Sequence, residues 1–461
     1  MSETRREKDF LGEVNVPARA YYGVQTWRAV QNFPISGMRA PEVFNRAFAE
    51  IKKAAALAHK ELGALKPELA DAIAQAADEM IAGKFADDMV VDVFQAGAGT
   101  SQHMNVNEVL ANRASELLGG KLGEYKPVHP NDHVNMGQST NDVFPTAMRL
   151  AALLTVPELL KAMRALAAAL DRKAKEFADV VKSGRTHLQD AVPVTLGQEF
   201  GAYAEAVGRA ADHIEEQTSP LREVGIGGSA TGSGLNTVPG YRQKVVERLS
   251  KQTGLELCSA ANLFEAMQSM AAFVRLSGAL RVAALELGRI SSDLRLLSSG
   301  LTTGLAEITL PAVQPGSSIM PGKVNPVIAE CMNMICFQVI GCDAALAQAA
   351  GAGQLELNVM MPVIAYNLLR SIQIFTNGVR MLRERCVEGI TANRERCAAY
   401  LASTLGLATV LNPVIGYHKA AEVARKAANT GKTIRQVVLE EGILTEKELD
   451  ALLARSLGRG K

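Results

Sequence analysis

The chain has little of what nucleic-acid-binding proteins use. Aromatic residues make up 5% of its 461 residues and include a single tryptophan, so few side chains are available for stacking on bases. Lys and Arg number 49 against 48 Asp and Glu, which leaves a formal net charge of +1. Because binding to phosphate backbones needs a basic excess or patch, we expect no nucleic-acid partner. Hydrophobic residues make up 48% of the chain, enough for a large core over roughly three units of about 150 residues each.

Disulfide, targeting and membrane signals are also scarce. The cysteines include no C-x-x-C pair, so in a chain of this length they indicate reduced, buried thiols. They are Cys258, Cys331, Cys336, Cys342, Cys386 and Cys397. The first residues, Met1–Asp9, are charged and lack the apolar segment of a secretory signal. No run reaches about 18 uncharged apolar residues, the length that spans a bilayer. We therefore expect a soluble, cytoplasmic protein with no membrane-spanning helix and no membrane partner.

Helix breakers are sparse in the middle of the chain. No proline lies between Pro239 and Pro311, and residues 260–301 are expected to form one helix or nearly so, weakest at Gly278 and Gly288. Apolar residues surround much of this helix, so it has to be buried on several sides. The simplest way to bury it is a helix bundle shared between subunits.

The pattern of helices and breakers predicts an all-α protein in three parts. An N-terminal helical domain covers residues 1–138, a central domain of long bundled helices covers 139–390, and a small C-terminal helical domain covers 391–461. Pro157 is expected to interrupt the first central helix. In the N-terminal domain, a helix is expected from Asn107 to Leu118, after an interruption rich in Gly, Ser and Asn.

Sharp helix boundaries are predicted in the C-terminal domain. Thr433 with Gln436, and Thr445 with Glu448, have the spacing of capping boxes, in which two orphan backbone N–H groups are satisfied by side chains. Gly431 is an expected helix end, since glycine adopts the left-handed conformation that closes a helix.

The segment Gly316–Pro326, of sequence GSSIMPGKVNP, combines two hydroxyls, an ammonium and a carboxamide. Pro and Gly inside it exclude a helix, so it is predicted to be a loop between two apolar helical runs. Polar loops of this kind often hold catalytic groups, although an ordinary turn between helices would also explain Gly-Ser-Ser alone. Lys323 follows Ser317 by six positions and Asn325 follows it by eight, which favours a functional site.

Three more polar segments interrupt the apolar pattern. Residues 97–108 read GAGTSQHMNVNE and residues 135–142 read NMGQSTND. The first of these is explained either by a helix N-terminus with Ser and Asn caps or by an anion site on freed N–H groups. In the second, residues 139–141 are explained by an N-cap cluster for the following helix. Residues 183–190 read SGRTHLQD and break an apolar helical region. A helix cap is a weaker explanation for these polar residues than for the other two segments.

Together these four segments resemble the motifs of the fumarase/aspartase lyase superfamily, and the resemblance runs from Tyr21 to Glu446. Members of this superfamily remove a proton from the carbon next to a carboxylate and expel an amine or a hydroxide from the neighbouring carbon. The resemblance implies that Ser317 is the catalytic base, its alkoxide stabilised by backbone N–H groups of the loop. It also implies that His187 binds a carboxylate or relays a proton. The substrate-binding residues that it implies are Thr100, Ser139, Thr140, Asn141, Thr186, Lys323 and Asn325.

The resemblance also implies a homotetramer. In this superfamily four subunits pool their central helices and each active site takes its motifs from three subunits, so an isolated subunit is expected to be inactive. The other expected partner is a small dicarboxylate. We expect no required cofactor and no metal site, with Mg2+ left open as an activator. His129 and His133 are four positions apart, but Pro130 and Asn131 between them indicate a loop and not a metal pair on a helix.

The choice between the aspartase and fumarase branches of the superfamily depends on shorter sequence matches. Residues 21–26, YYGVQT, and 139–141, STN, resemble the aspartase branch, whereas residues 129–135, HPNDHVN, resemble the class II fumarase segment that forms a second carboxylate site. Residues 102–103, QH, fit neither pattern neatly. We expect the aspartase activity, the reversible deamination of L-aspartate to fumarate and ammonia through an aci-carboxylate, with class II fumarase as the alternative. A non-catalytic structural role would predict loss of the base or of its carboxylate-binding partners, and these are intact.

Overall fold

The computed structural model describes residues 3–456. Residues 1–2 of the predicted N-terminal domain and 457–461 of the predicted C-terminal domain lie outside that range. The helices are α1 (Val24–Asn32), α2 (Glu42–Glu61), α3 (Pro67–Ile81), α4 (Thr100–Leu117), α5 (Thr140–Glu176), α6 (Leu196–Glu216), α7 (Tyr241–Thr253), α8 (Leu263–Gln268), α9 (Ala271–Leu297), α10 (Val327–Ala350), α11 (Met361–Arg385), α12 (Arg394–Ser403), α13 (Ala408–Ile415), α14 (Tyr417–Thr430), α15 (Ile434–Glu440) and α16 (Glu446–Ser456).

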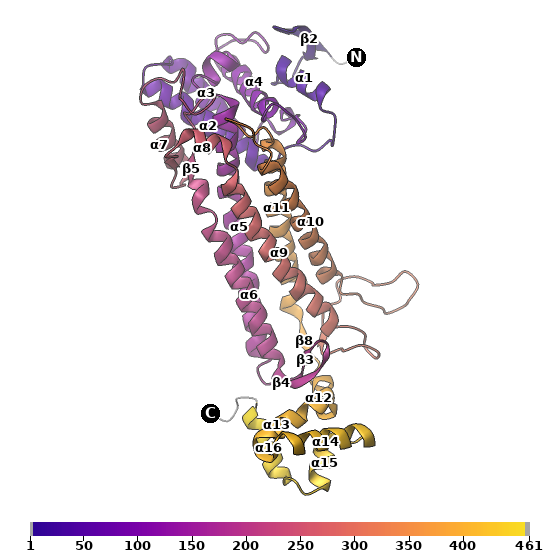
Figure 1. Ribbon diagram of the computed structural model, residues 1–461. Coiled ribbons are helices and arrows are strands. Elements are labelled where there is room, and N and C mark those ends of the chain that lie inside the picture. Colours follow the sequence, from indigo (N-terminus) through magenta and orange to yellow (C-terminus); the bar gives the residue numbers. More distant parts are fainter. Residues whose placement is uncertain (1–2, 457–461) are drawn as a thin grey trace. The chain divides into compact units, whose positions relative to one another are not determined.

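Strands are short and occur in pairs. They are β1 (Thr4–Asp9) with β2 (Gly12–Pro17), β3 (Val181–Thr186) with β4 (Gln189–Thr195), β5 (Glu223–Val224) with β6 (Cys258–Ser259), and β7 (Ile308–Thr309) with β8 (Thr391–Ala392). Short helical turns are η1 (Ala86–Asp88), η2 (Pro130–Val134), η3 (Ser219–Arg222), η4 (Val387–Gly389) and η5 (Leu405–Leu407). Helices dominate the described chain (Figure 1), which confirms the predicted all-α class.

The chain divides into two compact units. Unit 1 comprises residues 1–160, 212–282 and 338–375, and unit 2 comprises residues 161–211, 283–337 and 376–461. The boundary runs through the long helices α5, α6, α9, α10 and α11. The predicted three-part division at residues 138 and 390 stays a prediction.

In unit 1, helix α2 packs against α3 and α7, and α3 packs against α4. Three phenylalanines join α2 to α5. The ring centroids of Phe44 and Phe48 lie 5.0 Å apart, and that of Phe144 lies 5.2 and 5.7 Å from them. All three rings are buried, and their edge-to-face contacts add to the hydrophobic gain of burial. This core carries the N-terminal ends of α4 and α5, where the polar segments of unit 1 lie.

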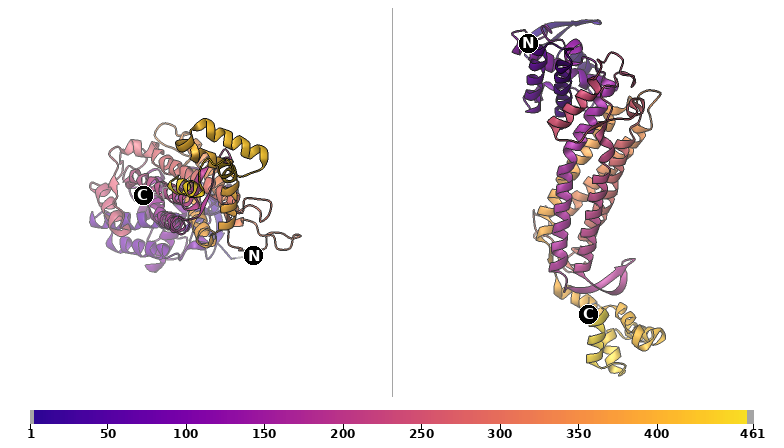
Figure 2. Two further views of the ribbon diagram at one scale, coloured as in Figure 1. Left: turned by 90° about the horizontal axis from the view of Figure 1, so that it is seen from below. Right: turned by 90° about the vertical axis from the view of Figure 1, so that its left-hand side faces the viewer.

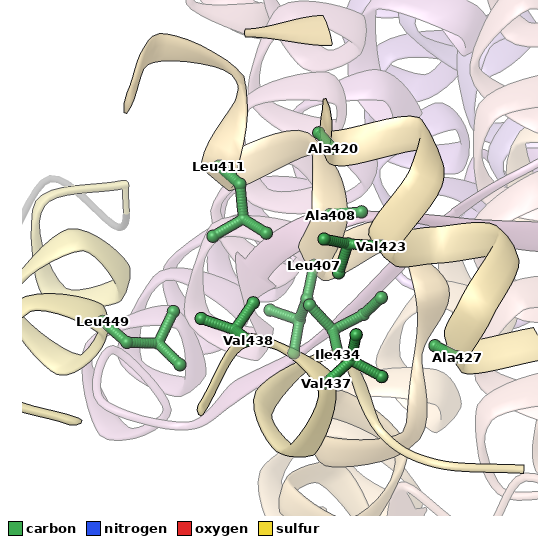
Figure 3. Packing of buried hydrophobic residues seen from close by; sticks show 10 residues of the cluster. All are labelled: Leu407, Ala408, Leu411, Ala420, Val423, Ala427, Ile434, Val437, Val438 and Leu449. Carbon is green, nitrogen blue, oxygen red and sulfur yellow. The ribbon is translucent and has the colours of Figure 1, made fainter. Parts of the chain in front are cut away.

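In unit 2, the C-terminal helices enclose a small core of their own (Figure 3). Its buried residues are Leu407, Ala408, Leu411, Ala420, Val423, Ala427, Ile434, Val437, Val438 and Leu449. They come from η5, α13, α14, α15 and α16, the short elements drawn in yellow in Figure 2. Apolar side chains at helical spacing therefore hold these helices together by burial.

The predicted boundaries of these helices are confirmed. The Thr433 hydroxyl accepts a hydrogen bond from Gln436 N at 3.2 Å, and Gln436 Oε1 accepts one from Thr433 N at 2.8 Å. Thr445 and Glu448 exchange the same two bonds at 3.3 and 2.8 Å. Gly431 closes α14 with φ 69°. Local chemistry alone decides these positions, which is why the sequence predicts them.

Helix α4 begins at Thr100, so the start predicted at Asn107 was wrong. The first turns of α4 are rich in polar residues, and this composition led to the prediction of a loop there. Tertiary contacts bind buried polar groups in these turns, however. Gln102 Nε2 donates to Asn45 Oδ1 at 2.6 Å, and Asn105 Oδ1 accepts a hydrogen bond from Val90 N at 3.1 Å. A buried polar residue with partners is compatible with a helix.

Helix α5 runs unbroken from Thr140 to Glu176, although Pro145 and Pro157 lie inside it. The predicted interruption at Pro157 was therefore wrong. A proline inside a helix removes one backbone hydrogen bond. Val156 and Leu160, on the same stretch of unit 1, are only 1% and 6% exposed, and the burial of this face offsets the loss.

The long helix predicted over residues 260–301 is divided at residues 269–270, between α8 and α9. The expected weak points, Gly278 and Gly288, lie inside α9. A Cβ atom at Gly288 would lie 3.6 Å from Cβ of Cys336 on α10. This glycine therefore allows two helices of unit 2 to approach closely.

Two helices, α5 and α10, are long and apolar enough to cross a membrane by length and composition, and a third span results if the bent pair α12 with residues 405–415 counts as one. This criterion tolerates charged residues, and neither helix contains the uncharged apolar run of about 18 residues on which the sequence expectation rested. The expected absence of a membrane-spanning helix stays a prediction. The most apolar stretch of α5 is 78% buried within the protein, whereas that of α10 is 39% buried. On α10, Met334 and Phe337 are 67% and 66% exposed. Helix α10 therefore presents an apolar surface that needs cover.

Candidate active site

Glycine geometry shapes the start of helix α4. Gly99 is the N-cap with φ 95°, and a Cβ atom there would lie 2.1 Å from the buried ring of Phe144, so no larger residue fits. The next residue, Thr100, is exposed, and its hydroxyl donates to Gly97 O at 2.7 Å. Thr100 thus lies at the accessible N-terminal end of α4, where backbone N–H groups favour anions.

The start of helix α5 is held by the buried carboxylate of Asp142. Its Oδ1 accepts a hydrogen bond from Ser139 N at 2.9 Å, and its Oδ2 accepts bonds from Gly227 N and Ser229 N, both at 3.0 Å. Burial raises the pKa of Asp142 to about 6. A glycine-rich loop and the end of α5 are therefore tied through one carboxyl group.

Two of the predicted substrate-binding residues meet directly, since Thr100 Oγ1 lies 3.2 Å from Thr140 Oγ1. Ser139 and Asn141 flank Thr140. Ser139 Oγ accepts a bond from Asn141 N at 3.2 Å, and Asn141 Nδ2 donates to Ala230 O at 2.8 Å. The structure therefore brings together the four predicted residues that lie in unit 1.

Behind Thr140 lies a buried polar chain that the sequence did not reveal. His103 Nδ1 is 2.8 Å from Thr140 Oγ1, and its Nε2 is 2.6 Å from Nζ of Lys52. Lys52 Nζ also donates to Asn135 Oδ1 and Gln138 Oε1, both at 2.9 Å. Lys52 and His103 are 0% and 1% exposed, and this burial lowers the pKa of both side chains well below their usual values.

One sequence signal does point to Lys52. Phe44, Phe48, Ile51 and Ala55 form the buried stripe of α2, and Lys52 lies within that stripe at helical spacing. A charged residue on such a stripe needs polar partners. Its partner His103 is 51 positions away in the sequence, so only the fold identifies it.

Thr186 and His187 lie on a β-hairpin in unit 2. Strands β3 and β4 pair antiparallel with Thr186 opposite Gln189, so His187 and Leu188 form a two-residue turn, with φ of 55° and 57°. Such turns match the twist of the strands, although positive φ is uncommon for residues other than glycine. Thr186 and His187 are both exposed. The break that the sequence indicated is therefore a strand pair.

A buried ion cluster anchors the base of this hairpin. Arg185 Nη1 lies 2.9 Å from Glu307 Oε1, and Lys182 Nζ lies 2.8 Å from both Glu307 Oε2 and Glu199 Oε1. Glu307 is 0% exposed, so its charge depends on these partners. Since Glu307 directly precedes β7, the cluster links the hairpin to the segment that leads to Ser317.

The loop that follows is closed on itself. Gly316 N donates to Lys323 O at 2.7 Å, and Asn325 Nδ2 donates to Gly316 O at 2.5 Å. A Cβ atom at Gly316 would lie 2.5 Å from Lys323 O, so the closure requires glycine. The Lys323 side chain is exposed and Asn325 is half-buried.

Within this loop the Ser317 hydroxyl faces two backbone donors. Ser317 Oγ accepts hydrogen bonds from Ile319 N at 3.2 Å and from Met320 N at 2.9 Å. Two N–H groups aimed at one oxygen are the arrangement that stabilises an oxyanion. The loop can therefore lower the cost of ionising this serine.

The nine predicted residues are divided between the units. Unit 1 holds Thr100, Ser139, Thr140 and Asn141, and unit 2 holds Thr186, His187, Ser317, Lys323 and Asn325. Their assigned roles stay predictions.

Among residues 3–456, no group of three or more His, Cys, Asp or Glu side chains is placed to hold a metal ion. His129 precedes the π-helical turn η2 and His133 lies in it. His133 Nδ1 accepts a hydrogen bond from His129 N at 2.8 Å. The two rings are therefore involved in shaping a turn.

Comparison with known proteins identifies the family. The family described as Lyase matches residues 12–341, and that described as Fumarase C C-terminus matches residues 407–455. Aspartate ammonia-lyase from Bacillus subtilis (strain 168) is 50% identical over 451 residues, covering 98% of this chain and 95% of that protein. Fumarate hydratase class II from Thermosynechococcus vestitus is 47% identical over 461 residues, covering 100% and 99%.

Among solved structures, fumarate lyase:delta crystallin from Brucella melitensis bound to cobalt has a TM-score of 0.96 and 49% identity, covering 100% of both chains. This chain is accordingly an all-α lyase. It belongs to the fumarase/aspartase lyase superfamily, so the resemblance seen in its motifs is confirmed.

Proposed function

We propose that this protein is an aspartate ammonia-lyase, which converts L-aspartate reversibly to fumarate and ammonia. The observation that carries the proposal is the pair of backbone N–H groups on Ser317 Oγ. Such donors make a serine alkoxide accessible as a base. The aspartate ammonia-lyase at 50% identity supports ammonia as the leaving group.

In the proposed reaction, Ser317 takes the Cβ proton of L-aspartate. The electron pair moves into the β-carboxylate and gives a dianionic aci-carboxylate. Thr100, Ser139, Thr140 and His187 hold this group, and their hydrogen bonds strengthen as its charge grows. The contact between the Thr100 and Thr140 hydroxyls at 3.2 Å supports a shared site.

The other end of the substrate meets cationic and amide groups. Lys323 and Asn325 bind the α-carboxylate by charge and by hydrogen bonding, Thr186 supports this contact from the hairpin, and Asn141 contacts the amino group. The Cα–N bond then breaks and ammonia leaves. The exposed Lys323 side chain is free to reach a ligand, and closure of the loop would exclude water.

The proposed active form is a homotetramer whose active sites each draw on three subunits. The exposed apolar surface of α10, with Met334 and Phe337, supports contacts between subunits. We further propose that the enzyme is cytoplasmic and requires no cofactor, with Mg2+ acting at most as an activator.

The test is the appearance of fumarate by ultraviolet absorbance, with L-aspartate in one cuvette and L-malate in another. Fumarate from L-aspartate alone is the expected result. The base is tested by Ser317→Ala, with Ser318→Ala as the matched control one residue along. Turnover should collapse in Ser317→Ala far more than affinity and remain in Ser318→Ala. More than a tenth of wild-type turnover in Ser317→Ala would exclude Ser317 as the base.

Class II fumarase is the second candidate. It is favoured by the fumarate hydratase class II that is 47% identical over the whole length of this chain. Fumarate from L-malate alone would establish this activity and would replace ammonia by water as the leaving group.

A further inference from the structure

Lys52 is a buried cation whose partners are neutral. No ion pair of its ammonium is found in the part of the chain that the structure describes, and its three polar contacts are His103 Nε2, Asn135 Oδ1 and Gln138 Oε1. A buried charge of this kind is costly unless every proton is bonded. The charge of Lys52 therefore decides which atoms of this site donate and which accept.

With Lys52 charged, all three of its N–H groups donate. His103 Nε2 then accepts, so the ring proton sits on Nδ1 and donates to Thr140 Oγ1, 2.8 Å away. Since the Thr140 oxygen accepts this bond, the Thr140 proton remains available. In this state Thr140 is a donor, as an incoming carboxylate requires.

With Lys52 neutral, the pattern reverses. Its two N–H groups serve Asn135 and Gln138, and its lone pair accepts from His103 Nε2–H. Nδ1 of His103 then becomes an acceptor, and the Thr140 hydroxyl donates its hydrogen bond to Nδ1. Thr140 can no longer donate outward. Both states satisfy every buried group, and they differ by one proton.

We propose that Lys52 and His103 are positioning residues that make Thr140 a hydrogen-bond donor, so that dicarboxylate binding takes up one proton at Lys52. This inference rests on the proposed role of Thr140 in holding a substrate carboxylate. The proton comes from solvent and returns to it when the dicarboxylate leaves. One N–H bond forms on Lys52, and the ring proton of His103 changes from Nε2 to Nδ1; no other covalent bond forms or breaks.

The surroundings fit a neutral histidine and a lysine that titrates. Burial lowers the pKa of both side chains, and the positive charge of Lys52 lowers that of His103 further. The charged groups that act on Lys52 are His103 from α4 and Asp142 from α5, whose negative charge partly counters the lowering. Phe48 stacks on the His103 ring at 5.9 Å between centroids and an angle of 20°, which fixes its orientation.

The test is calorimetric titration of the intact protein with succinate, an unreactive dicarboxylate, in two buffers of different ionisation enthalpy. We expect uptake approaching one proton at alkaline pH, where Lys52 is neutral before binding. The dissociation constant should then rise by up to about tenfold per pH unit. Lys52→Met should abolish the uptake and flatten the pH dependence. His103→Gln, which leaves Lys52 but removes the tautomer switch, should do the same.

His59→Gln is the matched control, because His59 is also buried on α2 but makes no contact with Thr140 among the described residues. It should keep both the uptake and the pH dependence. Unchanged uptake in Lys52→Met would overturn the proposal, since another group would then take the proton. Full uptake in His103→Gln would also overturn it, because charge attraction alone would explain the result.

We call the coupling of Lys52, His103 and Thr140 the relay. Failure of the proposed reaction is distinguishable from failure of the relay. Succinate binding with proton uptake but no fumarate from L-aspartate would reject the proposed function and leave the relay in place. Normal deamination with pH-independent succinate affinity would reject the relay alone. Absence of any succinate binding would also reject the relay, since Thr140 would then hold no dicarboxylate.

Discussion

The guanidinium of Arg185 lies 2.9 Å from the buried carboxylate of Glu307, measured from Nη1 to Oε1. Arg185 directly precedes Thr186 and His187 on the hairpin, and Glu307 precedes β7 and the loop with Ser317. This ion pair therefore couples two of the polar segments of unit 2. The second oxygen of Glu307 contacts Lys182 at 2.8 Å, so one carboxylate bridges two cations.

Replacing Glu307 by Gln should destabilise the protein and reduce turnover. It leaves Arg185 and the buried Lys182 without their shared carboxylate, a change that costs about 3–5 kcal/mol when one partner of a buried pair is removed. Denaturant unfolding and steady-state kinetics measure the two effects. The matched control is Glu205→Gln, whose partner Arg209 is 79% exposed; a change within about 0.5 kcal/mol is expected there. Equal effects of the two variants would contradict the prediction.

Gly99→Ala should destabilise unit 1 more than a glycine replacement that costs only backbone strain. Gly99 has φ 95° and its added Cβ would meet the Phe144 ring at 2.1 Å, whereas Gly254 has φ 70° and no atom within 4 Å. Gly254→Ala should therefore cost about 1–2 kcal/mol, and Gly99→Ala should add about 1–3 kcal/mol of overpacking. Thermal unfolding of both variants measures the difference, and similar values of Tm would argue against it.

Stability should depend on His59 below neutral pH. Burial lowers the pKa of His59 from 6.5 to about 4. Between these values the unfolded chain binds a proton that the folded protein does not, so the stability that His59 contributes is lost as pH falls, at up to about 1.4 kcal/mol per pH unit. Replacing His59 by Phe, which retains the stacking on Tyr241, should remove this part of the pH dependence.

The pH dependence of His59→Phe has to be compared with that of wild type, because protonation of buried carboxyl groups changes stability in the opposite direction. Burial raises the pKa of Asp142 to about 6 and that of Glu108 to about 7. The folded protein binds their protons first, so these groups add stability as pH falls through that range. Denaturant unfolding of wild type and variant from pH 7 to about pH 4 isolates His59. Parallel curves for the two proteins would contradict the prediction.

Lys323→Met should weaken substrate recognition without weakening the fold. The side chain is exposed, and loss of a charge-assisted hydrogen bond to a carboxylate costs about 1.5–3 kcal/mol, or roughly 10- to 150-fold in kcat/KM. Lys175→Met is the control, since Lys175 is 76% exposed and pairs with Asp171 on α5. Steady-state kinetics with L-aspartate should show the loss in Lys323→Met only. A similar kcat/KM for both variants would remove Lys323 from the binding site.

Local features were predicted well and long-range ones were not. The capping boxes at Thr433 and Thr445 depend on residues three positions apart, so the sequence contains all of their partners. The early start of α4 at Thr100 and the unbroken course of α5 through Pro157 depend on burial supplied by other segments. Propensity alone favoured the wrong answer in both cases, because tertiary contacts outweigh it.

The sequence by itself determined the helical class, the superfamily and the polar segments, because these follow from composition, periodicity and short motifs. The tertiary structure alone decided which distant groups meet: Lys52 with His103, and Arg185 with Glu307. It also turned the segment around His187 into a hairpin. Such contacts depend on the burial of polar groups that must find partners, and no spacing along a single chain specifies where those partners lie.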